Sequence, residues 1–492
     1  MVNLALILLA AAAPARPAEV EALVDRARGL APEFAADALI RIADKVNGRE
    51  WKRELLEDAF RRAAGAQQPL KKAAVAPLRG TPNGLMDRAF AQGLDALSLQ
   101  CRAVRALIPL DPAKARELFF EIPAPKLQRL GCEDPLVYDP SSYYVLLGEI
   151  AGRAFGPNEA ADEPFKLLQS RLGALESPLQ LAPAARLLAS ARLNAAEFQA
   201  LAAGFAAALK NMAGDDRSFS FAISRRGGLS RAMLDLVRTA GNSEAGAQPL
   251  VEAYRAFLVR HLKAERCADS SEPVSSGASF GLAAAGTPLA EAEQVADAVR
   301  FFNDSLRVPD VRPIAGDEVL AAKVAGAAGG LRVCESAECK DFVRRYNALL
   351  FGAGGMPLGP EQKAAAEWHA RLKEYLGSLA EWREDSSGGA SLLFVQKCQL
   401  YSDLVNVVPN GADREMVLRA YAGFLEQNSY QRESRIEWFL PANTLIARVF
   451  MDPIGLRTVM EELRNSSDPV ISFYCALEAF APRPPGESLS LL

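Results

Sequence analysis

The sequence predicts an all-α fold: an array of antiparallel helical hairpins forming an α/α solenoid or a toroid-like superhelix, in one or two helical domains. Two observations support this prediction. Apolar residues recur at helical spacing almost everywhere, and many of the breaks between periodic segments are only two or three residues long. Strand-like alternation is limited to residues 218–224, which we expect to form a loop or the edge of a helix, because one short run cannot make a sheet.

Three amphipathic helices are expected near the amino terminus, over residues 19–30, 33–46 and 50–64. Pro32 suits the first position of the second helix, and Asn47-Gly48 suits its end. A longer helix is expected from about Leu85 to Ile108, and Asp111-Pro112 should cap and open the next one. The pattern broadly resembles tetratricopeptide and HEAT-type superhelices, but no signature recurs at a fixed period, so the resemblance identifies no family.

Size and charge exclude several classes of partner. The chain has 492 residues, half of them apolar, and a formal net charge of −4 from 56 basic and 60 acidic residues. Such a balance offers no general attraction for nucleic acid or for an anionic membrane surface. No apolar run reaches the length that spans a bilayer, so we expect no transmembrane helix in the mature chain.

The first 15 residues have the pattern of a secretory signal peptide. Leu4 to Ala13 is an apolar stretch, and Ala13-Pro14-Ala15 forms an A-x-A cleavage pattern, although the segment before Leu4 carries no Lys or Arg. The alternative is a short buried first helix. We expect a mature chain that starts near Arg16 and is exported to the periplasm or the extracellular space.

A stretch rich in Ser, Gly and Pro divides the rest of the chain. It contains Gly277-Ala278-Ser279-Phe280-Gly281, which has the G-x-S-x-G spelling of a hydrolase nucleophile, but no apolar strand precedes it and His369 lies inside a predicted helix. We therefore interpret it as a linker. The predicted order is a signal peptide (1–15), helical domain one (16–268), the linker (269–290), helical domain two (291–480) and a flexible tail (481–492).

The seven cysteines fall into two groups. Three lie on apolar helical stripes and are expected to be core thiols: Cys101, Cys398 and Cys475. Four lie in polar stretches near predicted helix ends and could form two disulfides in an oxidising compartment: Cys132, Cys267, Cys334 and Cys339. We favour the pairs Cys132–Cys267 and Cys334–Cys339; the second requires a loop or helix end at that point.

An aromatic stripe is the strongest candidate for a binding surface. Ala366-Glu367-Trp368 recurs as Ala380-Glu381-Trp382 fourteen residues later, which places the two tryptophans about 40° apart on one helix face, with Tyr375 between them. The stripe either packs into the core or forms a groove in which Trp368, Tyr375 and Trp382 stack on a sugar or a peptide.

Motifs for catalysis and cofactors are scarce. Only His261 and His369 are present and no zinc-type cluster of cysteines occurs, so no metal or other cofactor is expected. Glu433-Ser434 resembles the Glu-Ser element of lytic transglycosylases, which would imply a general acid, but the later Gly-rich segment of that family is missing. No catalytic residue is assigned.

Two classes of function remain. The first is an exported, non-catalytic interaction or scaffold protein whose partner is an unknown protein or peptide, or a cell-envelope polysaccharide. The second is a carbohydrate-active or other hydrolytic enzyme that uses carboxylate acid/base chemistry in an aromatic-lined helical cleft.

Export is directly testable. Because the apolar stretch ends in an A-x-A site, the chain purified from its native cell should lack residues 1 to 15. Intact-mass measurement should give a species that starts near Arg16 in the exported fraction. Recovery of a cytoplasmic product that starts at Met1 would contradict the prediction.

Overall fold

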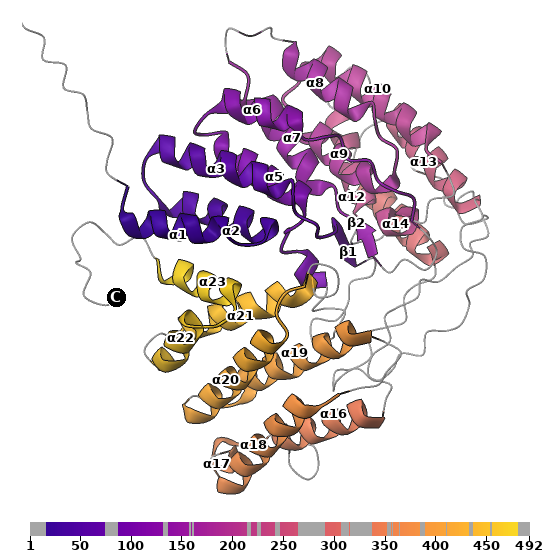
Figure 1. Ribbon diagram of the computed structural model, residues 1–492. Helices are drawn as coiled ribbons and strands as arrows, with labels where there is room; N and C mark the ends of the chain where they lie inside the picture. The colour runs from indigo at the N-terminus through magenta and orange to yellow at the C-terminus, as the bar shows by residue number, and fades with distance from the viewer. Residues whose placement is uncertain are drawn as a thin grey trace, which may run out of the picture.

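The computed structural model describes residues 16–73, 87–130, 136–156, 159, 162–213, 218–223, 228–241, 247–263, 291–306, 314, 337–351, 356, 358–363, 365–383, 389–409, 411–431, 436–452 and 455–480. Most of these residues are helical, and the strands among them amount to one short pair (Figure 1). The all-α class is therefore confirmed.

The three helices predicted near the amino terminus are present as α1 (Ala18–Arg28), α2 (Pro32–Lys45) and α3 (Arg49–Ala63). Pro32 is the first residue of α2, where its missing N–H costs no helical hydrogen bond. Gly48 has a φ of 96°, a conformation that residues with a side chain rarely adopt, and this lets the chain reverse between α2 and α3.

The long helix predicted over residues 85–108 is wrong. A short helical turn at 87–90 ends before Gly93, whose φ of 62° lies outside the right-handed helical region. Asp95 then starts α5 (Ala96–Leu107) by accepting a hydrogen bond from the backbone N–H of Ser98. The next prediction is confirmed: Asp111 caps α6 (Pro112–Glu121) by accepting from the backbone N–H of Lys114.

The remaining helices follow in chain order, and capping residues explain several starts. Ser177 and Asn194 form capping boxes with Gln180 and Glu197. The elements are α7 (Ser141–Arg153), α8 (Glu163–Leu172), α9 (Pro178–Ser190), α10 (Ala195–Asn211), α11 (Ser218–Ile223), α12 (Leu229–Gly241), α13 (Gln248–Lys263), α14 (Glu291–Ser305), α16 (Ala337–Leu350), α17 (Pro360–Lys363), α18 (Ala366–Glu381), α19 (Gly389–Val407), α20 (Ala412–Gln427), the 3-10 helix η1 (Ile436–Trp438), α21 (Phe439–Phe450), α22 (Arg457–Arg464) and α23 (Pro469–Ala479).

One antiparallel pair of strands joins two connections between helices. Strand β1 (Lys71–Ala73) pairs with β2 (Leu136–Tyr138), with Lys72 opposite Val137. Residues 218–223 of the alternating run form the short helix α11, and its Phe219, Phe221 and Ile223 are all buried. Three alternate apolar residues can all be buried on so short a helix because it is covered by α9, α12 and α14.

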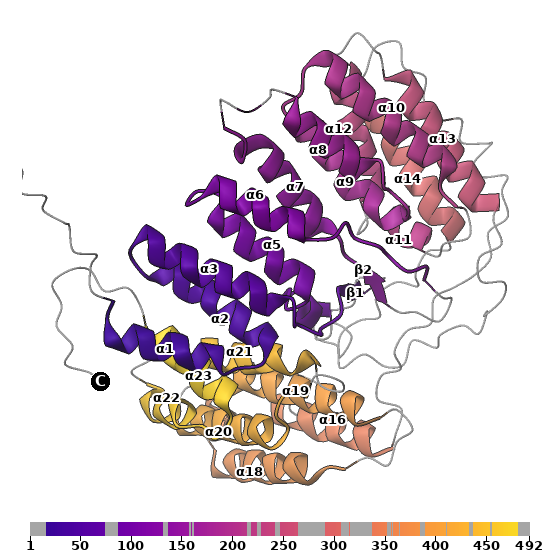
Figure 2. The same cartoon turned by 45° about the horizontal axis from the view of Figure 1, so that its top comes forward.

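Helices that pack together follow a definite order. In the first part of the chain α2 packs on α3, α3 on α5, α5 on α7, α7 on α9, α9 on α12 and α12 on α14. In the last part α16 packs on α18, α18 on α20, α20 on α21 and α21 on α23. Because α23 also packs on α1 and α2, the first and last helices of the described chain lie side by side (Figures 1 and 2).

Helix α14 packs with the helices that precede it, although the sequence-based division places it at the start of the second domain. Tyr254 of α13 and Phe302 of α14 have ring centroids 5.5 Å apart, and Arg238 of α12 donates to the Ser305 carbonyl at 2.7 Å. The predicted leader, linker and tail lie outside the described residues.

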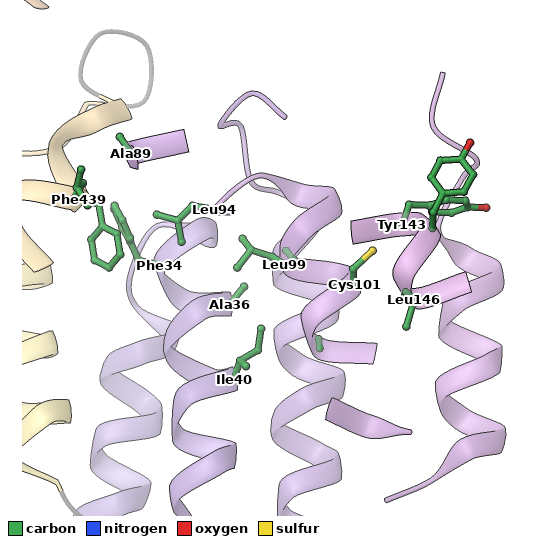
Figure 3. Close-up of a cluster of buried hydrophobic side chains, with 14 of the residues drawn as sticks. Phe34, Ala36, Ile40, Ala89, Leu94, Leu99, Cys101, Tyr143, Leu146 and Phe439 are labelled. Atoms are coloured by element: carbon green, nitrogen blue, oxygen red, sulfur yellow. The ribbon is translucent and has the colours of Figure 1, made fainter. Parts of the chain in front are cut away.

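We call the contact of α1 and α2 with Tyr430, α21 and α23 the seam. Its apolar part is an aromatic group around Phe34, which is fully buried and lies beside Phe439 (Figure 3). The ring centroids of Tyr430 and Phe439 lie 4.6 and 5.0 Å from that of Phe34. Tyr474 of α23 extends the group, 4.8 Å from Phe439. Such aromatic pairs add stability beyond the apolar area that they bury.

The polar part of the seam centres on Asp37, a carboxylate that is almost completely buried. It accepts from Arg41 Nε at 2.8 Å, from an Arg102 guanidinium nitrogen at 2.8 Å and from the Tyr474 hydroxyl at 2.8 Å. One turn earlier the Tyr430 hydroxyl donates to buried Glu33. Burial of a carboxylate is tolerated when several donors compensate for the lost water, and the C-terminal part of the chain supplies one donor to each site: Tyr430 to Glu33 and Tyr474 of α23 to Asp37.

Replacement of Asp37 by Ala should destabilise the protein by at least about 2 kcal/mol, because Arg41, Arg102 and Tyr474 lose their shared acceptor. Urea denaturation at neutral pH measures the change. Glu461→Ala is a matched control, since it removes an exposed carboxylate paired with Arg457 and should cost under about 0.5 kcal/mol. Equal effects of the two variants would contradict this account of the seam.

Candidate functional site

Helix α19 carries an unusual number of buried polar side chains. Gln396, Lys397 and Gln399 are 1, 3 and 4% exposed, although long polar residues are seldom fully buried. The helix packs against α20, with Tyr401 stacked on Tyr421 at a centroid distance of 5.2 Å. Buried polar groups in an otherwise apolar core are costly unless they have partners, so α19 is the strongest candidate for a functional site.

Lys397 has a structural environment. Its ammonium donates to the Ala380 carbonyl at 3.3 Å and lies 5.6 Å from the centroid of the Phe424 ring. Ala380 lies in the last turn of α18, where carbonyls have no helical partner and a positive charge is favourable. These contacts account for a buried lysine without a ligand.

Asp403 lies one turn after Gln399 and has a perturbed acidity. The amide Nε2 of Gln399 donates to Asp403 Oδ1 at 2.8 Å. Burial raises the pKa of Asp403 to about 6, although the hydrogen bond from Gln399 and the positive charge of Arg88 both act to lower it. A half-buried carboxyl that titrates near neutrality is a recognised sign of functional chemistry.

Three tyrosines from other helices interact electrostatically with this carboxyl: Tyr346 of α16, Tyr375 of α18 and Tyr421 of α20. Burial raises the pKa of each phenol above its ordinary value, and the negative charge of Asp403 adds to the effect. Among the residues that the structure describes, the hydroxyl of Tyr375 is buried without a hydrogen-bond partner. We call Asp403, Gln399 and these three tyrosines the Asp403 cluster.

The predicted aromatic stripe lies in the core. Trp368, Tyr375 and Trp382 are 1, 2 and 2% exposed, so their rings offer no open face to a sugar or peptide in this structure. Trp368 Nε1 donates to the Leu349 carbonyl at 2.9 Å, and Trp382 stacks on Phe342 at a centroid distance of 4.4 Å. The stripe therefore packs into the core, where α16 covers it. The sequence pattern identifies the stripe but does not show which helix covers it.

Sequence reasoning missed the Asp403 cluster. The available signal was the polar spacing Gln396, Gln399 and Asp403 within the apolar run of α19, at intervals of three and four residues that place them on one helix face. That face would ordinarily be interpreted as solvent-exposed. Only the positions of α16, α18 and α20 show that it is covered.

Polar side chains also come together at two other places. His369 Nδ1 lies 2.7 Å from Asp413 Oδ2 at the start of α20, and both side chains are partly exposed. A small pocket lies beside β2, and its lining includes Asp139, Ser141 and Arg186. The Asp403 cluster, with its buried amide and phenols, is the stronger candidate.

The cysteine predictions are tested in part. Cys101, Cys398 and Cys475 are buried and form no disulfide, as predicted, and burial raises the pKa of Cys475 to about 12. Cys132, Cys267 and Cys334 lie outside the described residues, and Cys339 lies in α16 at a position where only the backbone is described. The two disulfides therefore stay predictions.

Several other predicted features also lie outside the described residues: Ser279 of the G-x-S-x-G motif and the Glu433-Ser434 pair. In the described part of the chain, no three His, Cys, Asp or Glu side chains form a group that could hold a metal ion. None of the described helices combines the length and the hydropathy needed to cross a bilayer.

Trp368 in α18 and Trp382 directly after it are both buried, but we expect their replacement to change the free energy of unfolding by different amounts. Leu349 lies in the last turn of α16, so its carbonyl depends on Trp368 Nε1, whereas Trp382 Nε1 has no hydrogen-bond partner among the described residues. Trp368→Phe should therefore cost about 1 kcal/mol more than Trp382→Phe in urea denaturation. A Trp382 variant that is the less stable of the two would contradict this assignment.

Comparison with known proteins adds no family: no family model, no curated protein and no solved structure matches the chain. Its function is therefore inferred from the residues and contacts described above.

Proposed function

We propose that this chain is an exported, all-helical, non-catalytic interaction or scaffold protein. The observation that carries the proposal is the order of packing, in which helices contact their neighbours in succession from α2 to α14 and from α16 to α23. We infer that successive antiparallel hairpins build one superhelical array. Arrays of this kind present long continuous surfaces and usually serve recognition.

Export is supported by the sequence and is compatible with the helices. The expected cleavage site precedes Arg16, and the first described helix, α1, begins at Ala18. Removal of residues 1 to 15 would therefore leave every described helix intact. The seam would also survive, because its N-terminal contributions come from α1 and α2.

The proposed partner is an unknown protein or peptide, or a cell-envelope polysaccharide. Exposed apolar side chains are common anchors in such contacts, and Phe120 of α6 and Val145 of α7 are about half exposed. The net charge of −4 gives no general affinity for nucleic acid.

A second function is favoured by one observation. Asp403 has a pKa of about 6 beside aromatic rings, which suits a general acid in a hydrolase that acts on carbohydrate or another substrate. Glycoside hydrolysis normally needs a second carboxyl roughly 5 to 10 Å from the first. The neighbours identified for Asp403 are tyrosines, an amide and an arginine, so the scaffold remains the leading proposal.

One experiment separates the two functions. Mature protein is incubated with purified, insoluble cell-envelope polysaccharide, and both bound protein and released soluble sugar are measured. In parallel, photo-crosslinking in intact cells identifies envelope proteins that contact the chain. Saturable binding or a discrete crosslinked partner, without release of sugar, is the expected result.

Release of soluble fragments that is lost in Asp403→Asn would support the enzyme and overturn the scaffold proposal. Phe120→Ser serves as the matched variant for binding, because it changes an exposed side chain and should leave the fold unaffected while weakening a contact at α6. Absence of binding, crosslinking and sugar release together would also contradict the scaffold proposal.

A further inference from the structure

Gln399 and Asp403 form an incomplete hydrogen-bonded pair on α19. The amide Nε2 of Gln399 donates to Asp403 Oδ1 at 2.8 Å, and the four-residue spacing on one helix holds the two groups together. The other atom of the same amide, Oε1, is buried and has no hydrogen-bond partner among the residues that the structure describes. A buried acceptor without a donor is expensive, so this orphan atom needs an explanation.

The chemistry of the amide and the carboxyl explains the unpaired acceptor. An amide presents a donor and an acceptor side by side, and a protonated carboxyl presents the complementary acceptor and donor. An ionised carboxylate has only acceptors, so it can use Nε2 but leaves Oε1 unpaired. One proton on Asp403 would convert the single hydrogen bond into a closed ring of two.

We propose that Asp403 holds a proton on Oδ2 and donates it to Gln399 Oε1, so that the acid–amide pair is a proton-binding site that makes the packing of α19 depend on pH. Loss of the proton to solvent leaves a carboxylate on Asp403 and restores the unpaired acceptor. No other reactant takes part.

Burial of the pair favours this protonation. Tyr346 of α16, Tyr375 of α18 and Tyr421 of α20 are close enough to interact electrostatically with Asp403, and burial keeps the pKa of each phenol above its ordinary value, so none of them ionises near neutrality. Arg88, in the helical turn at 87–90, is the positive charge that opposes protonation. Desolvation outweighs it and raises the pKa of Asp403 from the ordinary 3.8 to about 6.

The sign of the pH dependence follows. Between about pH 4 and pH 6 the folded protein holds this proton and the unfolded chain does not. The contribution of Asp403 to stability is therefore most favourable below about pH 4 and is lost as the pH rises through 6. This is opposite to a carboxylate in a salt bridge, whose contribution is lost on acidification.

The test uses the full chain and infrared difference spectroscopy between pH 7.5 and pH 5. The wild type should gain a carboxylic-acid C=O band with a midpoint near pH 6, and Asp403→Asn should lack that band. Asp235→Asn is the matched control, because it changes an exposed aspartate at an i,i+4 position from Arg231 and should leave the band unchanged. A wild-type band that appears only near pH 4 would overturn the proposal.

Stability measurements separate the hydrogen-bonded pair from simple removal of a charge. An asparagine at position 403 presents both a donor and an acceptor to Gln399, so Asp403→Asn should raise the urea midpoint at pH 7.5 and remove the gain that the wild type shows at pH 5. Asp403→Leu removes the charge but leaves the amide unpaired, so its midpoint should lie below that of Asp403→Asn. Equal midpoints for the two variants, or a loss of stability in Asp403→Asn at pH 7.5, would contradict the acid–amide pair.

Discussion

The contact of α2 with α21 and α23 joins the first helices of the chain to the last, and so links the two series of packed helices. Its centre is Asp37, whose three donors come from three helices: Arg41 from α2, Arg102 from α5 and Tyr474 from α23. A buried carboxylate with fewer donors would cost several kcal/mol. The docking of α23 is therefore coupled to the placement of α2 and α5, because all three helices supply donors to the same carboxylate.

The aromatic group around Phe34 makes the same contact favourable for a different reason. Phe34, Phe439 and Tyr474 bury large apolar surfaces, while the Asp37 site specifies which hydroxyl and which guanidinium groups must meet. Apolar burial supplies most of the driving force, and the buried charge supplies the geometry. In the same way, α19 combines apolar surroundings with a few buried polar groups, and the proton that we propose on Asp403 would give the unpaired Gln399 Oε1 its donor.

Local signals in the sequence were sufficient for the fold class and for many helix ends. Pro32 and Asp111 mark helix starts because their effects act within one turn, and the apolar periodicity identifies the core thiols Cys101 and Cys398 for the same reason. The predicted helix over 85–108 is interrupted at Gly93, which has a positive φ. Glycine can adopt a positive φ but is also found in helices, so its presence in the sequence does not predict the break. Periodicity indicates that a residue is helical and does not show which helix covers it.

That difference explains the candidate site. Trp368, Tyr375 and Trp382 were recognisable as one face, but only the position of α16 decides that the face is buried rather than open. Asp403 and Gln399 were unremarkable as sequence, because their significance comes from tyrosines that lie 18 to 57 residues from Asp403 in the chain, a separation that pattern reading does not connect. The contact of α2 with α23 spans an even greater separation, and neither segment has a sequence pattern that predicts the other as its partner.

A double-mutant cycle between Asp37 and Tyr474 tests the seam most directly. The free energy of unfolding is measured in urea for the wild type, Asp37→Ala, Tyr474→Phe and the double variant, all at neutral pH. If the hydroxyl of α23 donates to the carboxylate of α2 as described, the two effects should be coupled by about 1.5 to 3 kcal/mol, the range for a hydrogen bond to a charged group. Effects that add to within about 0.5 kcal/mol would show that the two groups do not meet, and would contradict the joining of the first and last helices at this contact.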